Sequence, residues 1–186
     1  MLKEFWSALK SGTDIRGVAV EGAGDEVNLT NDTVKAITNG FILWLSKKTG
    51  KTGEELKISV GRDSRISGPR LAETVKNTLL SAGVFVVDCD LASTPAMFMT
   101  TVELGCDGAV QITASHHPYD RNGLKFFTRE GGLEGDSITA ILELAQKGEA
   151  PEESINGRLV ENDFMTYYAG MLREQIKEEI NDLTIT

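Results

Sequence analysis

The stretch Leu56-Lys-Ile-Ser-Val60 is one of three short apolar runs that decide the fold. The other two are Val84-Phe-Val-Val87 and Ala109-Val-Gln-Ile112. Each run is too short and too apolar for a surface helix, and its composition is typical of a buried strand in a parallel sheet. Two further strands are expected at residues 124–128, after a turn at Asn122-Gly123, and at residues 15–20.

Helical patterns lie between these strands, because apolar residues recur there every three or four positions. The stripes are Val34, Ile37, Phe41 and Leu45, then Leu71, Val75 and Leu79, and finally Ile138, Ile141, Leu142 and Ala145. Thr30 can cap the first helix, and the second is expected to begin after Ser67. Thr94-Pro95 has the pattern of an N-cap followed by proline, opening another helix that stops at Gly105. Strands that alternate with helices predict an α/β fold, a three-layer αβα sandwich with a mixed, mostly parallel sheet.

The C-terminal part of the chain differs from the rest. Residues 146–156 are polar and rich in glutamate, which is typical of a loop. Phe164, Tyr167, Met171 and Leu172 then suggest an amphipathic helix, and Leu183-Thr-Ile-Thr186 resembles the first residues of another strand. We therefore expect residues 1–160 to form one domain, and residues 161–186 to be a linker helix and the start of a truncated second domain.

Composition excludes several classes of function. The formal net charge of −9 argues against general nucleic-acid binding and against binding to an anionic membrane surface. It leaves room for a phosphorylated small molecule, because a few cationic side chains can concentrate positive charge locally. Cys89 and Cys106 have no metal-ligand spacing and form no disulfide framework. With no apolar signal segment near the N-terminus, a cytoplasmic location is expected.

The segment Thr113-Ala-Ser-His-His-Pro-Tyr-Asp-Arg-Asn-Gly-Leu-Lys125 carries the most chemical information. It follows a predicted strand, and ligands of open α/β sheets bind at the carboxyl ends of strands. Both histidines of the chain, His116 and His117, lie in it, together with Arg121 and Lys125. In a chain of net charge −9, this local enrichment in cationic and hydrogen-bonding groups marks the segment as a candidate site.

The residues alone leave alternatives open. A Ser-His-Asp hydrolase is disfavoured, because Ser115 lacks the G-x-S-x-G elbow and the adjacent His116 rarely reaches back as its base. A zinc site is disfavoured because adjacent histidines on an extended chain point to opposite sides. No Cys or Glu stands at the spacing of a zinc motif either. A polar loop whose Pro118 and glycine merely make turns stays possible.

Four segments carry a resemblance to a known family. Thr113-Ala-Ser-His-His-Pro118 resembles the active-site serine signature of the phosphohexomutases, the phosphoglucomutase/phosphomannomutase superfamily. Asn122-Gly-Leu-Lys125 resembles the family's N-G-x-K run, and Gly12-Thr-Asp-Ile-Arg-Gly17 is similar to its G-T-x-x-R-G loop. Gly61-Arg-Asp-Ser-Arg65 resembles its G-R-D-x-R strand end. The matches stand in the family's order along nearly the whole chain.

The resemblance implies the roles of the site residues. Ser115 would be phosphorylated, Arg16 would approach the phosphoserine, His116 would add charge, and Lys125 would be an acid/base candidate near the transferring phosphate. Arg62 and Arg65 would support the loops, and His117 stands where the family often has asparagine. These roles suit phosphoryl transfer, which needs mostly positioning and neutralisation of charge.

The resemblance also implies a cofactor. The family's Mg²⁺ site is a D-x-D-x-D-R motif in the second domain, and Ser115 would add a ligand through its phosphate. This chain lacks that motif, so Mg²⁺ would be completed by residues outside it. Asp88-Cys-Asp90 is interpreted as a strand-end turn rather than a metal site.

Two hypotheses follow. In the first, the chain is the phosphoserine-bearing domain of a phosphohexomutase that interconverts hexose 1-phosphate and hexose 6-phosphate through a bisphosphate, and it is inactive in isolation. Its partners would be hexose phosphates, the hexose bisphosphate and the remaining domains of the same polypeptide, with no nucleic acid and no membrane. In the second, it is a stand-alone phosphate-binding or interaction module without turnover. Glucose, mannose and glucosamine phosphates all remain open as substrates.

Overall fold

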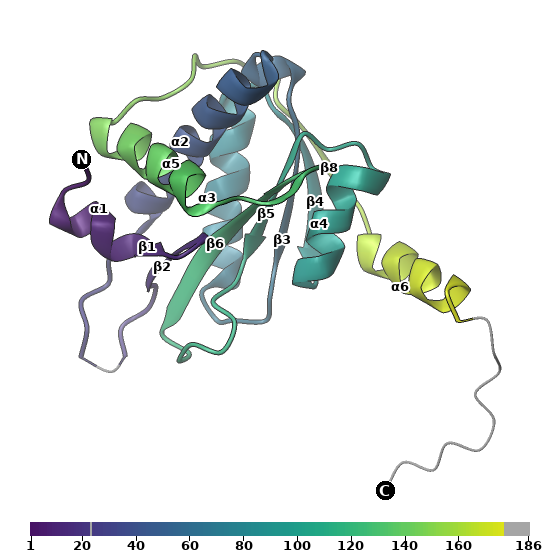
Figure 1. Ribbon diagram of the computed structural model, residues 1–186, viewed down its shortest axis with the longest axis horizontal. Helices are drawn as coiled ribbons and strands as arrows, with labels where there is room; N and C mark the ends of the chain where they lie inside the picture. The colour runs from purple at the N-terminus through teal and green to yellow at the C-terminus, as the bar shows by residue number, and fades with distance from the viewer. Residues whose placement is uncertain (23, 177–186) are drawn as a thin grey trace, which may run out of the picture.

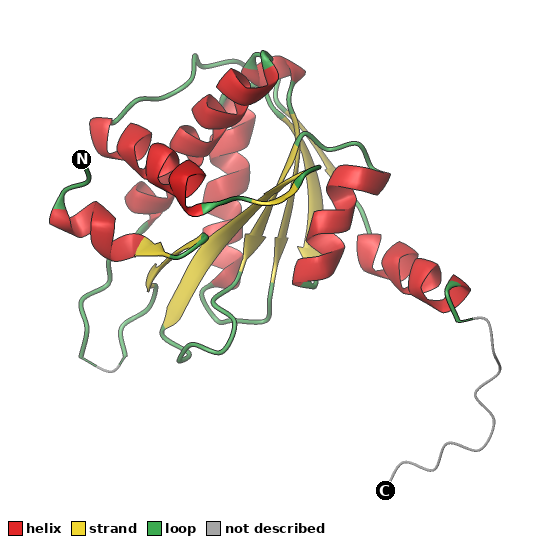
Figure 2. Cartoon of the chain, in the orientation of Figure 1, coloured by secondary structure: helices red, strands yellow, loops and turns green. Residues whose placement is uncertain are grey.

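The computed structural model describes residues 1–22 and 24–176, which form a sheet between two layers of helices (Figure 1). One layer contains α1 (Glu4–Leu9), α2 (Asn31–Thr49), α3 (Gly68–Ser81) and α5 (Gly135–Lys147). The other contains α4 (Thr94–Glu103) and α6 (Phe164–Glu174). A short 3₁₀ turn, Gly53–Glu55, precedes β3. The predicted three-layer α/β sandwich is therefore confirmed (Figure 2).

The sheet is mixed, and its two halves differ in strand direction. The strands are β1 (Lys10–Ser11), β2 (Asp14–Val18), β3 (Lys57–Arg62), β4 (Phe85–Leu91), β5 (Gly108–Ile112), β6 (Arg121–Thr128), β7 (Gly131–Gly132) and β8 (Arg158–Glu161). They are ordered β1-β2-β6-β5-β3-β4-β8, and β7 pairs with β6. The half β5-β3-β4-β8 is parallel, whereas β1, β2, β5, β6 and β7 are joined by antiparallel pairs.

The three apolar runs that opened the sequence analysis form the parallel centre of the sheet. β5 is buried at every residue, and β3 is buried at all but its two ends. Burial on both faces explains why these strands lack the alternation of apolar and polar residues that marks a half-exposed strand. One apolar core lies between the sheet and α2, α3 and α5, and a smaller one lies beneath α4 and α6.

The predicted turn at Asn122-Gly123 was wrong, because both residues lie inside β6. Asn122 is fully buried, and its side-chain amide donates to Ser67 Oγ (2.9 Å). Gly123 pairs across the strands with Arg16. A Cβ at Gly123 would collide with the carbonyl oxygen of Ile15 and lie 2.9 Å from Arg16 Cγ. The glycine is therefore needed for close packing and for the Arg16 side chain, rather than for a turn.

Two element boundaries differ from the prediction. The N-cap of α4 is Ser93 instead of Thr94, because the Ser93 hydroxyl accepts the bond from the Ala96 N–H (3.3 Å). Proline follows within the first turn of the helix, where its missing N–H is tolerated. The polar segment 146–156 begins with the last turn of α5, and it leads into β8, which the sequence analysis did not predict.

The C-terminal helix belongs to the second layer. Phe164, at the start of α6, is fully buried in the smaller core beside α4, and Tyr167 donates a hydrogen bond to Glu103 (2.8 Å). β8 ends one residue beyond the expected domain boundary at residue 160. The strand expected at residues 183–186 lies outside the described residues. No helix in the described ranges has the length and apolar character needed to cross a membrane.

The close packing around Gly123 generates a prediction. Gly123→Ala should lower the free energy of unfolding by about 2 kcal/mol, because the added methyl group has no room between β2 and β6. Gly132→Ala is the matched control on the neighbouring strand, where the nearest atom to an added Cβ is 3.7 Å away. Urea unfolding followed by tryptophan fluorescence measures both variants. Equal stability of the two variants would contradict the packing described here.

Candidate functional site

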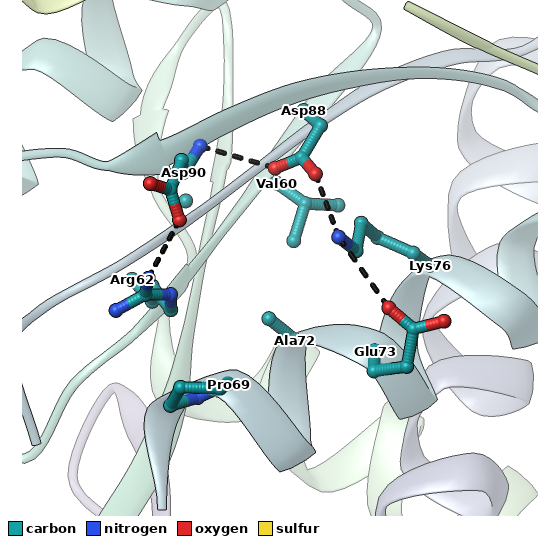
Figure 3. A pocket seen from close by; sticks show the side chains of 9 residues that line it. Val60, Arg62, Pro69, Ala72, Glu73, Lys76, Asp88 and Asp90 are labelled. Carbon is teal, nitrogen blue, oxygen red and sulfur yellow. Dashed lines mark hydrogen bonds and ion pairs between the residues drawn. The ribbon is translucent and has the colours of Figure 1, made fainter. Parts of the chain in front are cut away.

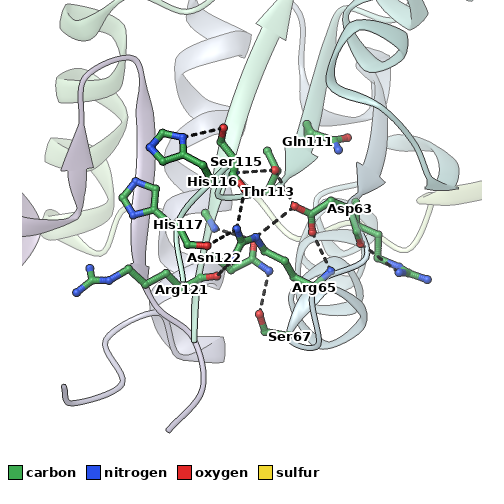
Figure 4. Close-up of polar contacts among 12 residues, drawn as sticks. Asp63, Arg65, Ser67, Gln111, Thr113, Ser115, His116, His117, Arg121 and Asn122 are labelled. Carbon is green, nitrogen blue, oxygen red and sulfur yellow. Dashed lines mark hydrogen bonds and ion pairs between the residues drawn. The ribbon is translucent and has the colours of Figure 1, made fainter. Parts of the chain in front are cut away.

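Two loops meet at the carboxyl edge of the sheet. β3 and β5 are parallel neighbours, and Arg62 pairs with Ile112 at their ends. The loop that follows β3, residues 63–67, therefore emerges beside the loop that follows β5, residues 113–120, which we call the serine loop. Figure 4 shows side chains from both loops interlocked around Arg65. This edge is where an open α/β sheet binds its ligands, as the sequence analysis expected.

Ser115 lies on the exposed side of the serine loop in an unusual backbone conformation. Its φ is +53°, in the left-handed region that residues other than glycine rarely occupy. Its N–H donates to Thr113 Oγ1 (3.2 Å), and the neighbouring Ala114 is fully buried. Strained backbone of this kind is concentrated at functional sites, where surrounding contacts hold it in place.

The two histidines lie differently from what was expected from the sequence. His116 Nδ1 lies 3.3 Å from Ser115 Oγ, so a histidine next to the serine does reach it. The rings of His116 and His117 are stacked with centroids 5.3 Å apart, whereas an extended chain would have pointed them to opposite sides. The reason is the left-handed residue before them, which turns the chain sharply. Among the described residues, no three histidine, cysteine or carboxylate side chains cluster as they would around a metal ion.

Arg16 and Lys125 are joined by Asp14, a residue to which the sequence analysis gave no role. Asp14 is buried, and its two oxygens accept from Lys125 Nζ and from Arg16 Nη2, each at 2.7 Å. Asp14 and Arg16 are two residues apart on β2, so their side chains lie on the same face of the sheet. Lys125 lies beside them on the neighbouring strand β6. The signal was present in the Gly12–Gly17 segment, since a carboxylate two residues before an arginine shares its face of a strand.

Arg16 has a buried donor without a partner. Its Nε is buried and, among the described residues, has no hydrogen-bond partner. A buried N–H without a partner is costly unless a water molecule or a ligand accepts from it. Because a guanidinium group donates charge-assisted hydrogen bonds to phosphate oxygens, Arg16 is suited to an anion at this edge.

The electrostatics of the serine loop are opposite to those of the whole chain. Partial burial lowers the pKa of His117, and the nearby positive charges of Arg16, His116, Arg121 and Arg65 lower it further. Charges that disfavour a cation on His117 favour an anion in the same place. A strongly acidic protein thus presents a local positive field around Ser115.

Arg62 and Arg65 turn in different directions from the end of β3. Arg65 donates hydrogen bonds to backbone carbonyl groups of the serine loop, as the supporting role predicts. Arg62 instead pairs with Asp90 (2.7 Å) at a cavity of about 160 Å³ (Figure 3). In that cavity Lys76 pairs with Asp88 (2.6 Å), so the cations and carboxylates satisfy one another. The cavity therefore offers no free positive charge to a phosphate.

The fold and this site define an α/β/α domain organised around a serine loop. Residues 9–152 match the family described as phosphoglucomutase/phosphomannomutase, alpha/beta/alpha domain I. The chain belongs to this family and corresponds to its first domain. The predicted resemblance to the phosphohexomutases is thereby confirmed.

Individual relatives agree with this assignment. A phosphoglucosamine mutase of Lactobacillus acidophilus is 32% identical over 194 residues, covering 100% of this chain and 40% of that protein. A phosphoglucosamine/phosphogalactosamine mutase of Sulfurisphaera tokodaii is 45% identical over 98 residues, 52% of this chain and 22% of that protein. The crystal structure of a phosphoglucomutase/phosphomannomutase family protein from Burkholderia thailandensis matches with a TM-score of 0.75 and 26% identity, covering 96% of this chain and 37% of that chain. The chain spans less than half the length of these relatives.

The left-handed backbone at Ser115 generates a prediction. Ser115→Gly should be more stable to unfolding than Ser115→Ala by about 1 kcal/mol, because glycine adopts a positive φ without steric cost. Both variants lose the hydroxyl, so the comparison isolates the backbone. Urea unfolding gives the two values.

Ser64 is the control for this comparison. It is exposed in the neighbouring loop and does not have a positive φ. There the order should reverse, with the glycine variant less stable than the alanine variant by about 0.5–1 kcal/mol. If alanine were the more stable residue at position 115 as well, Ser115 would not be held in the left-handed region.

Proposed function

We propose that this chain is the phosphoserine-bearing domain of a phosphohexomutase, with Ser115 as the residue that carries the phosphoryl group. The observation that supports this most directly is the position of Ser115, exposed on a cationic loop at the carboxyl edge of the sheet. The reaction is the interconversion of hexose 1-phosphate and hexose 6-phosphate through a hexose bisphosphate. A serine phosphate carries a charge of about −1.5 to −2, which the surrounding cations would neutralise.

The transfer needs one P–O bond to form as another breaks. A hydroxyl group of the hexose phosphate attacks the phosphorus atom of phosphoserine, and the bond to Ser115 Oγ breaks. The hydroxyl proton is released, and Oγ takes up a proton. The second half-reaction runs in reverse with the other phosphate of the bisphosphate, which restores phosphoserine.

The chain's own residues take distinct roles in this scheme. Arg16 binds phosphate oxygens through its unpartnered Nε. His116, whose Nδ1 lies 3.3 Å from Ser115 Oγ, donates to the phosphoryl group on that oxygen. Lys125, held by Asp14 on the neighbouring strand, is the acid/base that exchanges the proton at the reacting oxygen. Each group is attached to a strand or to a loop tied to one, which keeps it positioned for the reaction.

The described residues do not form a magnesium site by themselves, since no cluster of three metal-binding side chains occurs among them. Mg²⁺ prefers several hard oxygen ligands. We therefore propose that phosphorylated Ser115 supplies one of these ligands and that residues outside this chain supply the others. When bound, the metal ion would help to neutralise the charge of the phosphoryl group.

The length of the chain bears on its activity. Because it spans 40% of its Lactobacillus relative, we propose that residues 1–160 act as one domain of a longer polypeptide and that residues 161–186 lead into the next. Hexose phosphates, the hexose bisphosphate and the remaining domains would then be its partners, and the chain alone would be inactive. The names of the curated relatives make glucosamine phosphate a candidate substrate beside the glucose and mannose phosphates.

A chimera tests this proposal. This chain would replace the matching 40% of the Lactobacillus acidophilus phosphoglucosamine mutase. Conversion of glucosamine, glucose and mannose 1-phosphates would be measured with Mg²⁺ and the matching bisphosphates. We expect turnover in the chimera, loss of more than about 10³-fold in Ser115→Ala, and none in the isolated chain.

The controls separate the alternatives. Ser64→Ala, in the neighbouring loop, should retain activity in the chimera. A folded chimera without turnover would contradict the proposal and favour a phosphate-binding module. Ser115-dependent turnover by the isolated chain would show that the missing domains are not required.

A further inference from the structure

We propose that Arg65 is the positioning residue of the serine loop: its guanidinium group holds the backbone of Ser115 in the left-handed conformation without binding the phosphoryl group. This inference rests on the proposed function only in treating Ser115 Oγ as the phosphoryl carrier. The distinction matters because Arg16 and Arg65 both contribute positive charge near His117, and charge alone does not assign their roles.

All four N–H groups on the terminal nitrogens of the Arg65 guanidinium are already occupied. Its two terminal nitrogens donate to four backbone carbonyl oxygens, and the acceptors are those of Pro118 (2.6 Å), Arg121 (2.9 Å), Ser115 (2.8 Å) and His117 (2.7 Å). Its Nε lies 3.4 Å from Asp63 Oδ2. An arginine side chain has five N–H donors, so only the one on Nε, which faces the Asp63 carboxylate, lies outside these four bonds. Arg16, with its unpartnered Nε, is in the opposite situation.

Both peptide groups that flank Ser115 are tied to the loop after β3. On the carbonyl side, Ser115 O accepts from Arg65. On the amide side, Ser115 N–H donates to Thr113 Oγ1, which in turn donates to Asp63 Oδ2 (2.7 Å). Asp63 Oδ1 also accepts from the Arg65 N–H (3.0 Å). Fixing both neighbouring peptide groups determines the rotation of the backbone about Ser115, which explains how a serine keeps φ at +53°.

A lysine could not replace this arrangement. The four carbonyl groups belong to residues spread from 115 to 121, and they converge on one planar group (Figure 4). The side chain of Arg65 is only 12% exposed, so water does not readily substitute for it. An ammonium group offers three donors from a single point, whereas the guanidinium plane offers five in fixed directions. The shape of the group therefore matters in addition to its charge.

Amide hydrogen exchange measured by NMR tests the inference on this chain. The His117 and Arg121 N–H groups donate to Ala114 O and Pro118 O within the loop, each at 3.1 Å. In Arg65→Ala, exchange at these amides should become faster by about tenfold or more, while amides of β3 and β5 keep their rates. The ¹³C shifts of Ser115 should lose the signature of a left-handed residue.

Three further measurements distinguish a positioning role of Arg65 from a general loss of structure. Arg65→Lys keeps the charge and should fail to restore the loop. Millimolar guanidinium added to Arg65→Ala should restore protection, because it returns a planar set of N–H donors, and ammonium should not. Arg62→Ala is the matched control, since Arg62 pairs with Asp90 and touches no carbonyl group of the serine loop. An ordered loop in Arg65→Ala, or full restoration by lysine, would overturn the inference.

A kinetic arm tests the claim that Arg65 does not bind phosphate. In phosphorylation of Ser115 in the chimera by a hexose bisphosphate, Arg65→Lys should lower the maximal rate by about tenfold or more, with little change in the half-saturating concentration. A change confined to the half-saturating concentration would instead make Arg65 a ligand of the phosphate. The exchange measurement needs no phosphoryl transfer. A folded chimera that is never phosphorylated at Ser115 would therefore overturn the proposed function and leave the positioning role intact.

Discussion

The parallel pairing of β3 and β5 is the constraint on which the rest of the site depends. Parallel neighbours end at the same edge, so the loops after Arg62 and Ile112 must lie side by side. Asp63 and Arg65 on one loop can then hold the backbone of the other, and Ser115 keeps a conformation that it would not adopt in isolation. The site is thus a property of the sheet order, and the serine loop could not form it alone.

The positive charges at the site are also positioned by contacts between neighbouring strands and loops. The chain has a net charge of −9, yet several cations surround the serine loop. Asp14 joins Arg16 and Lys125 across two antiparallel strands, so two repelling cations can share a partly buried place. The terminal nitrogens of Arg65 donate to backbone carbonyl groups, whereas Nε of Arg16 has no hydrogen-bond partner among the described residues. Neighbouring residues of the same type therefore differ in what they can bind.

The sequence indicated those features that depend on local composition. The buried strands and amphipathic helices were predictable because burial on two faces, or on one stripe, selects apolar residues at a fixed spacing. β8 was not, because its four residues are exposed and are held by backbone pairing with β4. Asn122-Gly123 has the composition of a turn, and its placement inside β6 follows from contacts with Ser67 and Arg16, which are distant in sequence. Ser115 was identified by resemblance, whereas the ion pair between Asp14 and Lys125 depends on strand pairing, and the stacking of the histidines depends on the left-handed backbone before them.

The measurement that tests this account most directly is the site of phosphorylation. The chimera with the remaining domains of the Lactobacillus acidophilus enzyme would be incubated with Mg²⁺ and a hexose bisphosphate. Peptide mass spectrometry would locate any phosphate gained, with the Ser115→Ala and Arg16→Ala variants of the chimera beside it. The account predicts a single phosphate on Ser115, none in Ser115→Ala, and a rate lower by about 10²-fold in Arg16→Ala. A phosphate on another residue, or an Arg16→Ala variant that is labelled as fast as the parent chimera, would contradict it.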